Sequence, residues 1–409
     1  AVHGSGSVRL HDSEQFWSAT MDMHEKIAAD PVSFGSFRAY GTASLVNLIN
    51  EMGAYPTRNF QYDTFEGAAN TSGEAVVEDI LQRNRACFAC PIACTRVSEV
   101  KDGPYKGRGE GPEYESIWAL GALCGVSDLA AVAKANFICG DYGIDTISTG
   151  ATIACAMELF EKGALSEKEI GFSMRFGDAA AMVRAVEMTG KREGFGEALA
   201  DGSYRLAARY GHPEFFMGVK KLEMSAYSPR VFQGMALQYA TSNRGACHVR
   251  GNTVAAELYG IPRYMAPELL EQKEEMVRRP FQNSTAFVDS TGICLFTKFA
   301  ITHREICALL TPATGLDFSF DRSIEQGDRI WNIERMFNLR AGFTSDDDKL
   351  PQRVTEPSPD GPRAGSRAVL HEHLQTYYQL RGWDRSGRPT RAKLDELGLE
   401  DWWGVCSDA

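Results

Sequence analysis

Apolar residues recur at helical spacing along most of the chain, whereas the alternation of apolar and polar residues that marks strands is scarce. Capping signals accompany several of these runs, among them Gly163 after an apolar run and a capping box from Ser166 to Glu169. The pattern predicts a mainly α protein. The predicted helices span residues 44–53, 74–83, 128–143, 148–163, 178–192, 195–211, 267–279, 302–310, 324–342, 368–383 and 391–399, and one more begins after Ser166.

The chain has 409 residues, of which 44% are hydrophobic, and this length predicts two domains. The segment GHPEFFMGVKK is the best candidate for a boundary, so we predict domains at residues 1–217 and 218–409. The opening AVHGSGSVRL lacks a starting Met and looks like the end of a strand. We therefore expect the chain to begin just after another domain.

Charge and hydropathy exclude some classes of function. The net charge is −11 and no run is rich in Lys or Arg, which argues against a nucleic-acid partner. The longest apolar stretch, residues 120–139, is interrupted by Asp128 and Lys134, so we expect no membrane span. No secretory signal pattern is present, and we predict a cytoplasmic protein with reduced thiols.

The segment ACFACPIACT places Cys87, Cys90 and Cys94 within eight positions. A C-x2-C-x3-C spacing puts three thiolates on one short turn, and a [4Fe-4S] cluster commonly uses three local sulfurs and one distant sulfur. A zinc site, which also needs four ligands, and three free thiols are the alternatives. The spacing favours an iron–sulfur cluster over zinc.

The fourth ligand is not identified by spacing. Several of the remaining cysteines lie within apolar helical patterns, where Cys is usually a small buried hydrophobic residue. Cys294 differs because Asp289 and Gly292 of DSTGICLF suggest a turn that presents backbone groups to a ligand. The candidates are Cys124, Cys139, Cys155, Cys247, Cys294, Cys307 and Cys406.

Five segments, in order, closely resemble the tungsten-containing aldehyde:ferredoxin oxidoreductase family: RNRACFACPIAC, GPEYESIWALGALCGVSDL, YGIDTISTGATIACAMELFEKG, ATSNRGACH and DSTGICLF. The resemblance covers nearly the whole chain, including REGFGEALADGSYRLAARYGHPE, RIWNIERMFNLRAG and YYQLRGW. It implies two helical domains that together form one side of a bis-molybdopterin/tungsten and [4Fe-4S] site. It also implies that the family's N-terminal β domain is missing here and is a partner that covers the other face of the pterin.

The resemblance implies that Cys87, Cys90, Cys94 and Cys294 hold the cluster. The family's pterin-binding pattern, D-x-x-G-L-C/D, occurs twice. One copy is complete, and an Asp carboxylate suits the amino and ring N–H donors of a pterin. The other copy, GDYGID, has Gly140 where the family has the leading Asp. The implied pterin-binding residues are Gly143, Asp145, Arg250, Asp289, Gly292, Ile293 and Cys294.

The same resemblance places His248 beside the metal with Glu115 opposite, where the two would handle the proton and orient the aldehyde. Tyr114 is expected to donate a hydrogen bond to the carbonyl oxygen. Read alone, a single His is more often structural than catalytic. Glu113 is the neighbouring carboxylate that could be confused with Glu115, and its plainer interpretation is a loop residue.

The resemblance predicts oxidation of an aldehyde at a tungsten (or molybdenum) bis-molybdopterin centre. Electrons would leave singly through the [4Fe-4S] cluster to ferredoxin or an electron-transfer subunit. Two alternatives remain at this point. One is a tungstopterin reductase of another substrate, such as an aromatic thioester, and the other is an iron–sulfur electron-transfer module without pterin chemistry.

Overall fold

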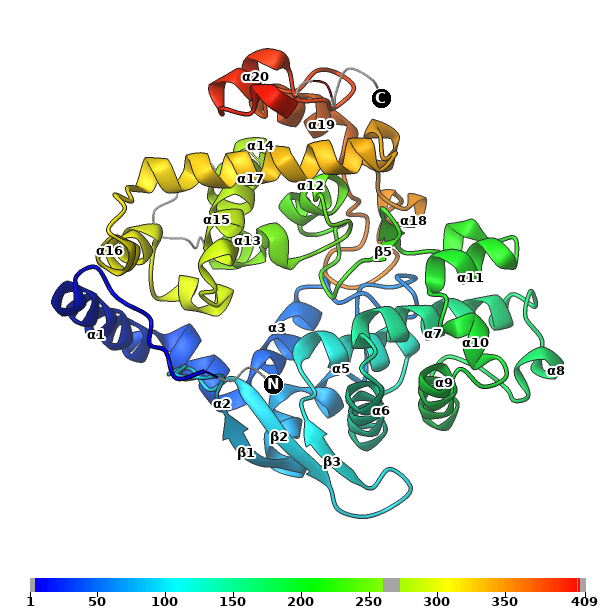
Figure 1. Cartoon of the computed structure of the whole chain (residues 1–409). Coiled ribbons are helices and arrows are strands. Elements are labelled where there is room, and N and C mark those ends of the chain that lie inside the picture. Colours follow the sequence, from blue (N-terminus) through cyan, green and yellow to red (C-terminus); the bar gives the residue numbers. More distant parts are fainter. Residues whose placement is uncertain (1–3, 260–272, 403, 405–409) are drawn as a thin grey trace.

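The computed structural model describes residues 4–259, 273–402 and 404, and the fold is mainly helical, as predicted (Figure 1). The helices before residue 217 are α1 (Ser13–Ala29), α2 (Phe37–Tyr40), α3 (Leu45–Glu51), α4 (Gly73–Ala75), α5 (Tyr114–Leu120), α6 (Leu129–Tyr142), α7 (Thr146–Glu161), α8 (Glu167–Ile170), α9 (Ala179–Lys191), α10 (Gly196–Leu199) and α11 (Ser203–Arg209). The later helices are α12 (Gln233–Thr241), α13 (Val254–Tyr259), α14 (Lys273–Met276), α15 (Ser284–Thr291), α16 (His303–Thr314), α17 (Phe320–Arg340), α18 (Gln352–Thr355), α19 (His371–Leu380) and α20 (Arg391–Glu396).

Local capping sets many of these helix ends. The Asp128 side chain accepts a hydrogen bond from Ala131 N at 3.1 Å and starts α6. Gly163 has a φ of 75° just after α7, and the capping box from Ser166 to Glu169 opens α8, so both sequence signals are confirmed. Residues 267–272 of one predicted helix lie outside the described residues, and α14 covers part of the remainder.

The predicted helix at residues 74–83 is wrong at its last three residues, which belong to a strand. Its first turns form α4 and a π-helical turn, η4 (Val76–Ile80), after which β1 (Leu81–Arg85) begins. β1 pairs antiparallel with β2 (Thr95–Val100), and β2 pairs antiparallel with β3 (Gly107–Glu110). The residues of β1 are polar and mostly exposed, so pairing with β2, rather than burial of an apolar face, decides its conformation.

Around residue 217 the chain forms a small hairpin of β4 (Gly218–Val219) and β5 (Leu222–Glu223). Its two turn residues, Lys220 and Lys221, both have positive φ, as a tight hairpin turn requires. The largest apolar core includes residues on both sides of this hairpin. The predicted domain boundary at residue 217 stays a proposal. Residues 4–10, which resemble a strand end in sequence, form no regular element.

The long helix α17 runs across the upper part of the molecule in Figure 1, and α15 and the π-helical turn η9 (Val277–Asn283) pack against it. Gly327 makes this approach close, because a Cβ there would lie 1.9 Å from the carbonyl oxygen of Asn283. α17 thus fixes α15, whose C-terminal turn carries Asp289 and leads to Cys294.

Among the described residues, no single helix is long and apolar enough to cross a membrane. One bent pair, Tyr114–Cys124 with Leu129–Tyr142, meets the length and composition criteria together across a 120° bend.

Replacing Gly327 with Ala should lower the free energy of unfolding by about 1–3 kcal/mol or more, because packed backbone has to move. The matched control is Gly140→Ala in α6, where a Cβ meets no heavy atom within 4 Å. That change should be neutral or stabilising by up to about 1 kcal/mol. Thermal and urea unfolding check both, and an unchanged midpoint for Gly327→Ala would contradict the described packing.

Candidate active site

Two titratable side chains from distant parts of the chain face each other. Glu115 lies in the first turn of α5, and His248 precedes the short turn η7 (Val249–Gly251) that follows α12. Glu115 Oε1 lies 3.5 Å from His248 Nε2, and Glu115 Oε2 accepts a hydrogen bond from Ala226 N at 2.9 Å. Glu115 Oε1 is buried and has no hydrogen-bond partner in the described part of the chain. The pair is therefore held in place, with one oxygen still available.

Burial sets the protonation of this pair. Burial raises the pKa of Glu115 to about 8. The hydrogen bond from the Ala226 N–H lowers this pKa, and the charge of Asp145 raises it by a smaller amount. Burial also lowers the pKa of His248 to about 4, and the charge of Arg244 lowers it further. At neutral pH the two groups are therefore a protonated carboxyl and a neutral imidazole, not an ion pair. Together they hold one transferable proton in the side chain of Glu115.

Tyrosines line one side of the pair. The ring of Tyr227 lies 5.9 Å from the ring of His248 and 5.4 Å from the ring of Tyr114, measured between centroids. The Tyr114 hydroxyl donates to the backbone oxygen of Ala226 at 2.9 Å, and Tyr114 is only 2% exposed. Tyr114 therefore holds the segment that also binds Glu115. Its hydroxyl proton is used in the bond to Ala226, so in this structure it is not directed at a substrate carbonyl oxygen.

The first predicted pterin segment is a link between two helices. Gly143 ends α6 in the left-handed region, and the Asp145 carboxylate accepts from Ser148 N at 2.7 Å to start α7. A Cβ at Gly143 would meet no heavy atom within 4 Å, so this turn borders open space. One Asp145 oxygen caps the helix, and its charge acts on Glu115. The segment thus lies near the Glu115–His248 pair.

The second predicted pterin segment lies at the end of α15. Gly292 has a φ of 75° and ends the helix, and its N–H bonds to the backbone oxygen of Asp289. Arg250 Nε lies 3.9 Å from Asp289 Oδ2, while Arg250 Nη1 lies 2.9 Å from Glu334 Oε1. The Asp289 side chain is 39% exposed. The structure therefore brings together Arg250 and Asp289, each of which was predicted as a pterin contact. Part of the Asp289 carboxylate remains exposed to solvent.

The three local cysteines lie in the loop between β1 and β2, which closes as an antiparallel pair. Ala89 and Ala93, each just before a cysteine, have φ of 53° and 54°. The left-handed backbone at these two positions reverses the direction of the chain twice. The small side chain of alanine limits the steric strain of that conformation. Arg96 in β2 is buried and donates to the backbone oxygen of Phe37, which ties the base of the loop to α2.

Cys294 approaches this loop from the other half of the chain. It begins the short turn η10 (Leu295–Phe299), and its pKa is raised by burial and by the nearby sulfurs of Cys87 and Cys90. Burial raises the pKa of Cys94 to about 11, with further contributions from Glu113 and from the other three sulfurs. The structure thus brings together the four cysteines that the resemblance implies. It buries the alternatives Cys124, Cys139, Cys155, Cys247 and Cys307, while Cys406 lies outside the described residues.

The donor set fits a cluster better than a single ion. No group of three or more His, Cys, Asp or Glu among the described residues is arranged to hold one metal ion. In a [4Fe-4S] cluster each sulfur binds a different iron, so the thiolates need not converge on one point. Burial, with a smaller contribution from the neighbouring sulfurs, raises the pKa of Cys94 and of Cys294, and bound iron would favour their thiolate forms.

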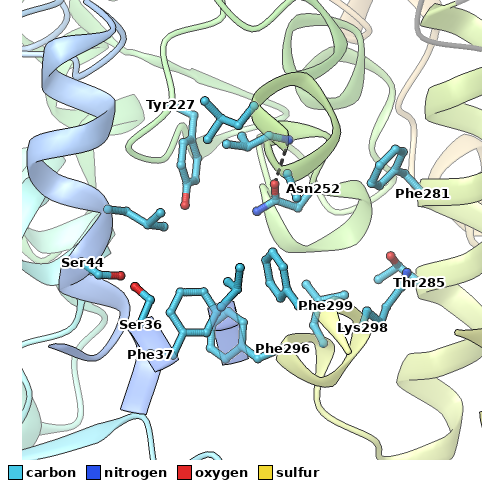
Figure 2. A pocket seen from close by; sticks show the side chains of 16 residues that line it. Ser36, Phe37, Ser44, Tyr227, Asn252, Phe281, Thr285, Phe296, Lys298 and Phe299 are labelled. Carbon is cyan, nitrogen blue, oxygen red and sulfur yellow. Dashed lines mark hydrogen bonds between the residues drawn. The ribbon is translucent and has the colours of Figure 1, made fainter. Parts of the chain in front are cut away.

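An apolar cavity of about 180 Å³ lies beside Tyr227, whose ring neighbours that of His248 (Figure 2). Figure 2 shows the hydroxyl of Tyr227 and the amide of Asn252 directed at its centre, with phenylalanine rings across from them. Tyr227 therefore belongs both to the cavity wall and to the surroundings of His248. The lining residues are Val32, Ser36, Phe37, Ser44, Leu45, Tyr227, Asn252, Val254, Ala255, Leu258, Phe281, Thr285, Leu295, Phe296, Lys298 and Phe299.

Comparison with known proteins decides the family. Residues 18–399 match the sequence model described as "Aldehyde ferredoxin oxidoreductase, domains 2 & 3". The chain belongs to the aldehyde ferredoxin oxidoreductase family.

Relatives within the family are longer than this chain. It is 46% identical over 407 residues to the tungsten-containing aldehyde ferredoxin oxidoreductase of Pyrococcus furiosus, and 46% identical over 406 residues to that of Thermococcus kodakarensis. Each match covers 98% of this chain and 67% of the relative, so the chain spans about two thirds of their length.

A solved structure shares the fold. The active site complex BamBC of benzoyl coenzyme A reductase with 1,5-dienoyl-CoA aligns with a TM-score of 0.78 over 100% of this chain and 69% of the other. Only 16% of the residues are identical, so this likeness bears on the fold alone.

Sequence reasoning missed Tyr227, Asn252 and Lys298. Tyr227 and Asn252 lie in segments without a chemical signature, YSPR and RGNT. Lys298 carries a weak signal, since a lysine inside LFTKFA interrupts an apolar run that contacts the cluster loop.

Replacing Cys294 with Ser should remove most of the iron from the purified protein, because one of four sulfur ligands is lost. The control is Cys155→Ala in α7, whose thiol is buried away from the loop and should leave the iron content unchanged. Iron analysis and the visible absorption of the cluster are the readouts. Equal iron in both variants would remove Cys294 from the ligand set.

Proposed function

We propose that this chain forms the helical part of an enzyme that oxidises aldehydes to carboxylic acids. The reaction takes an aldehyde and water to a carboxylic acid, two protons and two electrons. The observation that carries the proposal is the buried Glu115–His248 pair, which has one free carboxyl oxygen and neutral imidazole beside it. Once Glu115 has lost its proton, the pair can accept a proton as the two electrons leave.

A tungsten bis-pterin centre bound here would take up the two electrons, and a [4Fe-4S] cluster would carry them away one at a time. Cys87, Cys90, Cys94 and Cys294 hold that cluster in our proposal. Gly143 and Asp145 on one side, and Arg250 with the turn from Asp289 to Cys294 on the other, contact the pterins. Support comes from the open surfaces of both turns and from the attraction of Arg250 to Asp289.

Glu115 acts as the proton acceptor in its ionised form, and the imidazole of His248 accepts a hydrogen bond or passes the proton on. The N–H of Ala226 holds the other carboxylate oxygen, so rotation of the Glu115 side chain is restricted. The ring of Tyr227 excludes water from one face of His248. Tyr114 is a positioning residue, because its hydroxyl fixes Ala226, the same residue whose N–H binds Glu115.

The cavity supports an apolar aldehyde as substrate. An apolar cavity of roughly 150 Å³ accommodates one benzene molecule, so the volume here fits one ring or a short aliphatic chain. The aldehyde group is placed at the Tyr227 end, next to His248. Ferredoxin or an electron-transfer subunit takes the electrons, and the site of action is the cytoplasm.

Glu115→Gln should lower kcat/KM for aldehydes by about 100- to 10,000-fold, because general-base catalysis is lost while the shape is kept. The measurement is aldehyde-dependent reduction of a viologen dye by the intact, metal-loaded protein. Glu113→Gln is the matched control, since Glu113 bonds to Thr42 Oγ1 at 2.6 Å and lies outside the pair. Absence of aldehyde oxidation in the wild-type protein would overturn the proposed function.

The pH profile gives a second test. A carboxyl with a pKa of about 8 is protonated below that pH and becomes a base above it. We therefore expect kcat/KM to rise with pH through about 8, and we expect Glu115→Gln to remove that rise. The range from about pH 6 to about pH 9 brackets the expected titration of Glu115. If kcat/KM of the wild-type protein stays constant over that range, Glu115 is not the general base.

A further inference from the structure

The end of the cavity opposite Tyr227 contains a lysine in an otherwise apolar wall. Figure 2 shows Lys298 and Thr285 together on one side, across from Tyr227, with the rings of Phe37 and Phe296 along the lower wall in this view. Lys298 belongs to η10 and Thr285 to α15, so two separate elements bring them to this wall. An ammonium group in an apolar wall is costly unless it has polar partners.

A directed chain of hydrogen bonds supports the charge of Lys298. Its Nζ donates to Ser284 Oγ at 2.6 Å, and Ser284 Oγ lies 2.6 Å from His303 Nε2. His303 Nδ1 lies 2.9 Å from Ser323 Oγ, which donates to the backbone oxygen of Phe320 at 2.6 Å. Because Ser323 uses its only proton on Phe320, the proton of neutral His303 is on Nδ1, and Ser284 donates to Nε2.

Every dipole in this chain points away from Lys298, which stabilises a positive charge. Burial and the charge of Lys298 together lower the pKa of His303 to about 3, so the imidazole stays neutral. Burial lowers the pKa of Lys298 to about 8, although the charge of Asp289 acts in the opposite direction and raises it. The amine is therefore mostly protonated at neutral pH, and only one of its three protons is used by Ser284.

The neighbouring hydroxyl is also available. Thr285 is 1% exposed, and its Oγ1 has no hydrogen-bond partner in the part of the chain that the structure describes. Among the described residues the carboxylate that acts on Lys298 is that of Asp289, and it does so through its charge rather than through a hydrogen bond. A buried ammonium and a free hydroxyl on one wall together match a carboxylate, which accepts hydrogen bonds at both oxygens.

We propose that Lys298 and Thr285 form a subsite for a carboxylate, so that the preferred substrates are short aldehydes with a carboxylate at the far end. This inference rests on the proposed function, because the aldehyde group must pass Tyr227 at the other end of the cavity to reach His248 and Glu115. The apolar walls between the two ends fit the methylene chain of such an ω-oxo acid.

The test compares 6-oxohexanoate with hexanal, which have the same chain length and differ in the distal carboxylate. Lys298→Met should lower kcat/KM for 6-oxohexanoate by about ten- to a hundredfold, since a charge-assisted hydrogen bond is lost. The same change should leave hexanal unchanged or improve it. Thr285→Val should act in the same direction with a smaller effect, and Phe299→Leu, an apolar wall change, should affect both substrates alike.

A binding measurement on the metal-loaded protein separates this inference from the proposed function. Calorimetry should show tighter binding of adipate than of hexanoate, and Lys298→Met should abolish the difference. If neither aldehyde is oxidised but adipate still binds through Lys298, the proposed function fails and the subsite stands. Equal losses for both aldehydes in Lys298→Met would overturn the subsite. A loss of tungsten or pterin from that variant would also overturn it, because Lys298 would then be a cofactor contact.

Discussion

The candidate site depends on keeping a carboxyl group and an imidazole out of water where two distant segments of the chain meet. Glu115 comes from α5, His248 follows α12, and the 3.5 Å between them is maintained by the N–H of Ala226 and the surrounding tyrosines. Burial shifts the pKa values of both groups toward their neutral forms. A single proton is therefore stored beside a cavity, and proton transfer is available without a buried charge at rest.

The electron side of the site depends on a similar convergence. The loop between β1 and β2 contributes three thiols, and the turn after α15 contributes the fourth. Ile92 of the loop and Ile293 of the turn pack in one apolar cluster, which holds the two segments together. The same turn carries Asp289, so movement of α15 would disturb the predicted cluster and pterin contacts together. α17 prevents that movement by its close approach at Gly327.

Local signals predicted the local features well. The three-cysteine spacing, the capping box at Ser166 and the turn at Gly163 each depend on a few neighbouring residues. β1 was missed because its polar residues form a strand only through pairing with β2. Spacing could not select Cys294, since its approach to the loop is set by tertiary packing. The resemblance named it, and the structure brings it close.

The cavity was the least predictable part. Tyr227 and Asn252 have no sequence signature, and Lys298 carries only the weak signal of a lysine within an apolar run. Their roles depend on which side chains meet between η10, α13 and α15, and this is not encoded in any short segment. The roles of Glu115 and His248 remain predictions, supported by their geometry and by the family to which the chain belongs.

The most direct test is infrared difference spectroscopy of the Glu115 carboxyl group during a pH titration. We predict a protonated carboxyl band at neutral pH that disappears as the pH rises through about 8 and is absent from Glu115→Gln. A band that has already converted to carboxylate at pH values near the ordinary range for Glu, about 4 to 5, would contradict the raised pKa of Glu115 and the pH dependence derived from it.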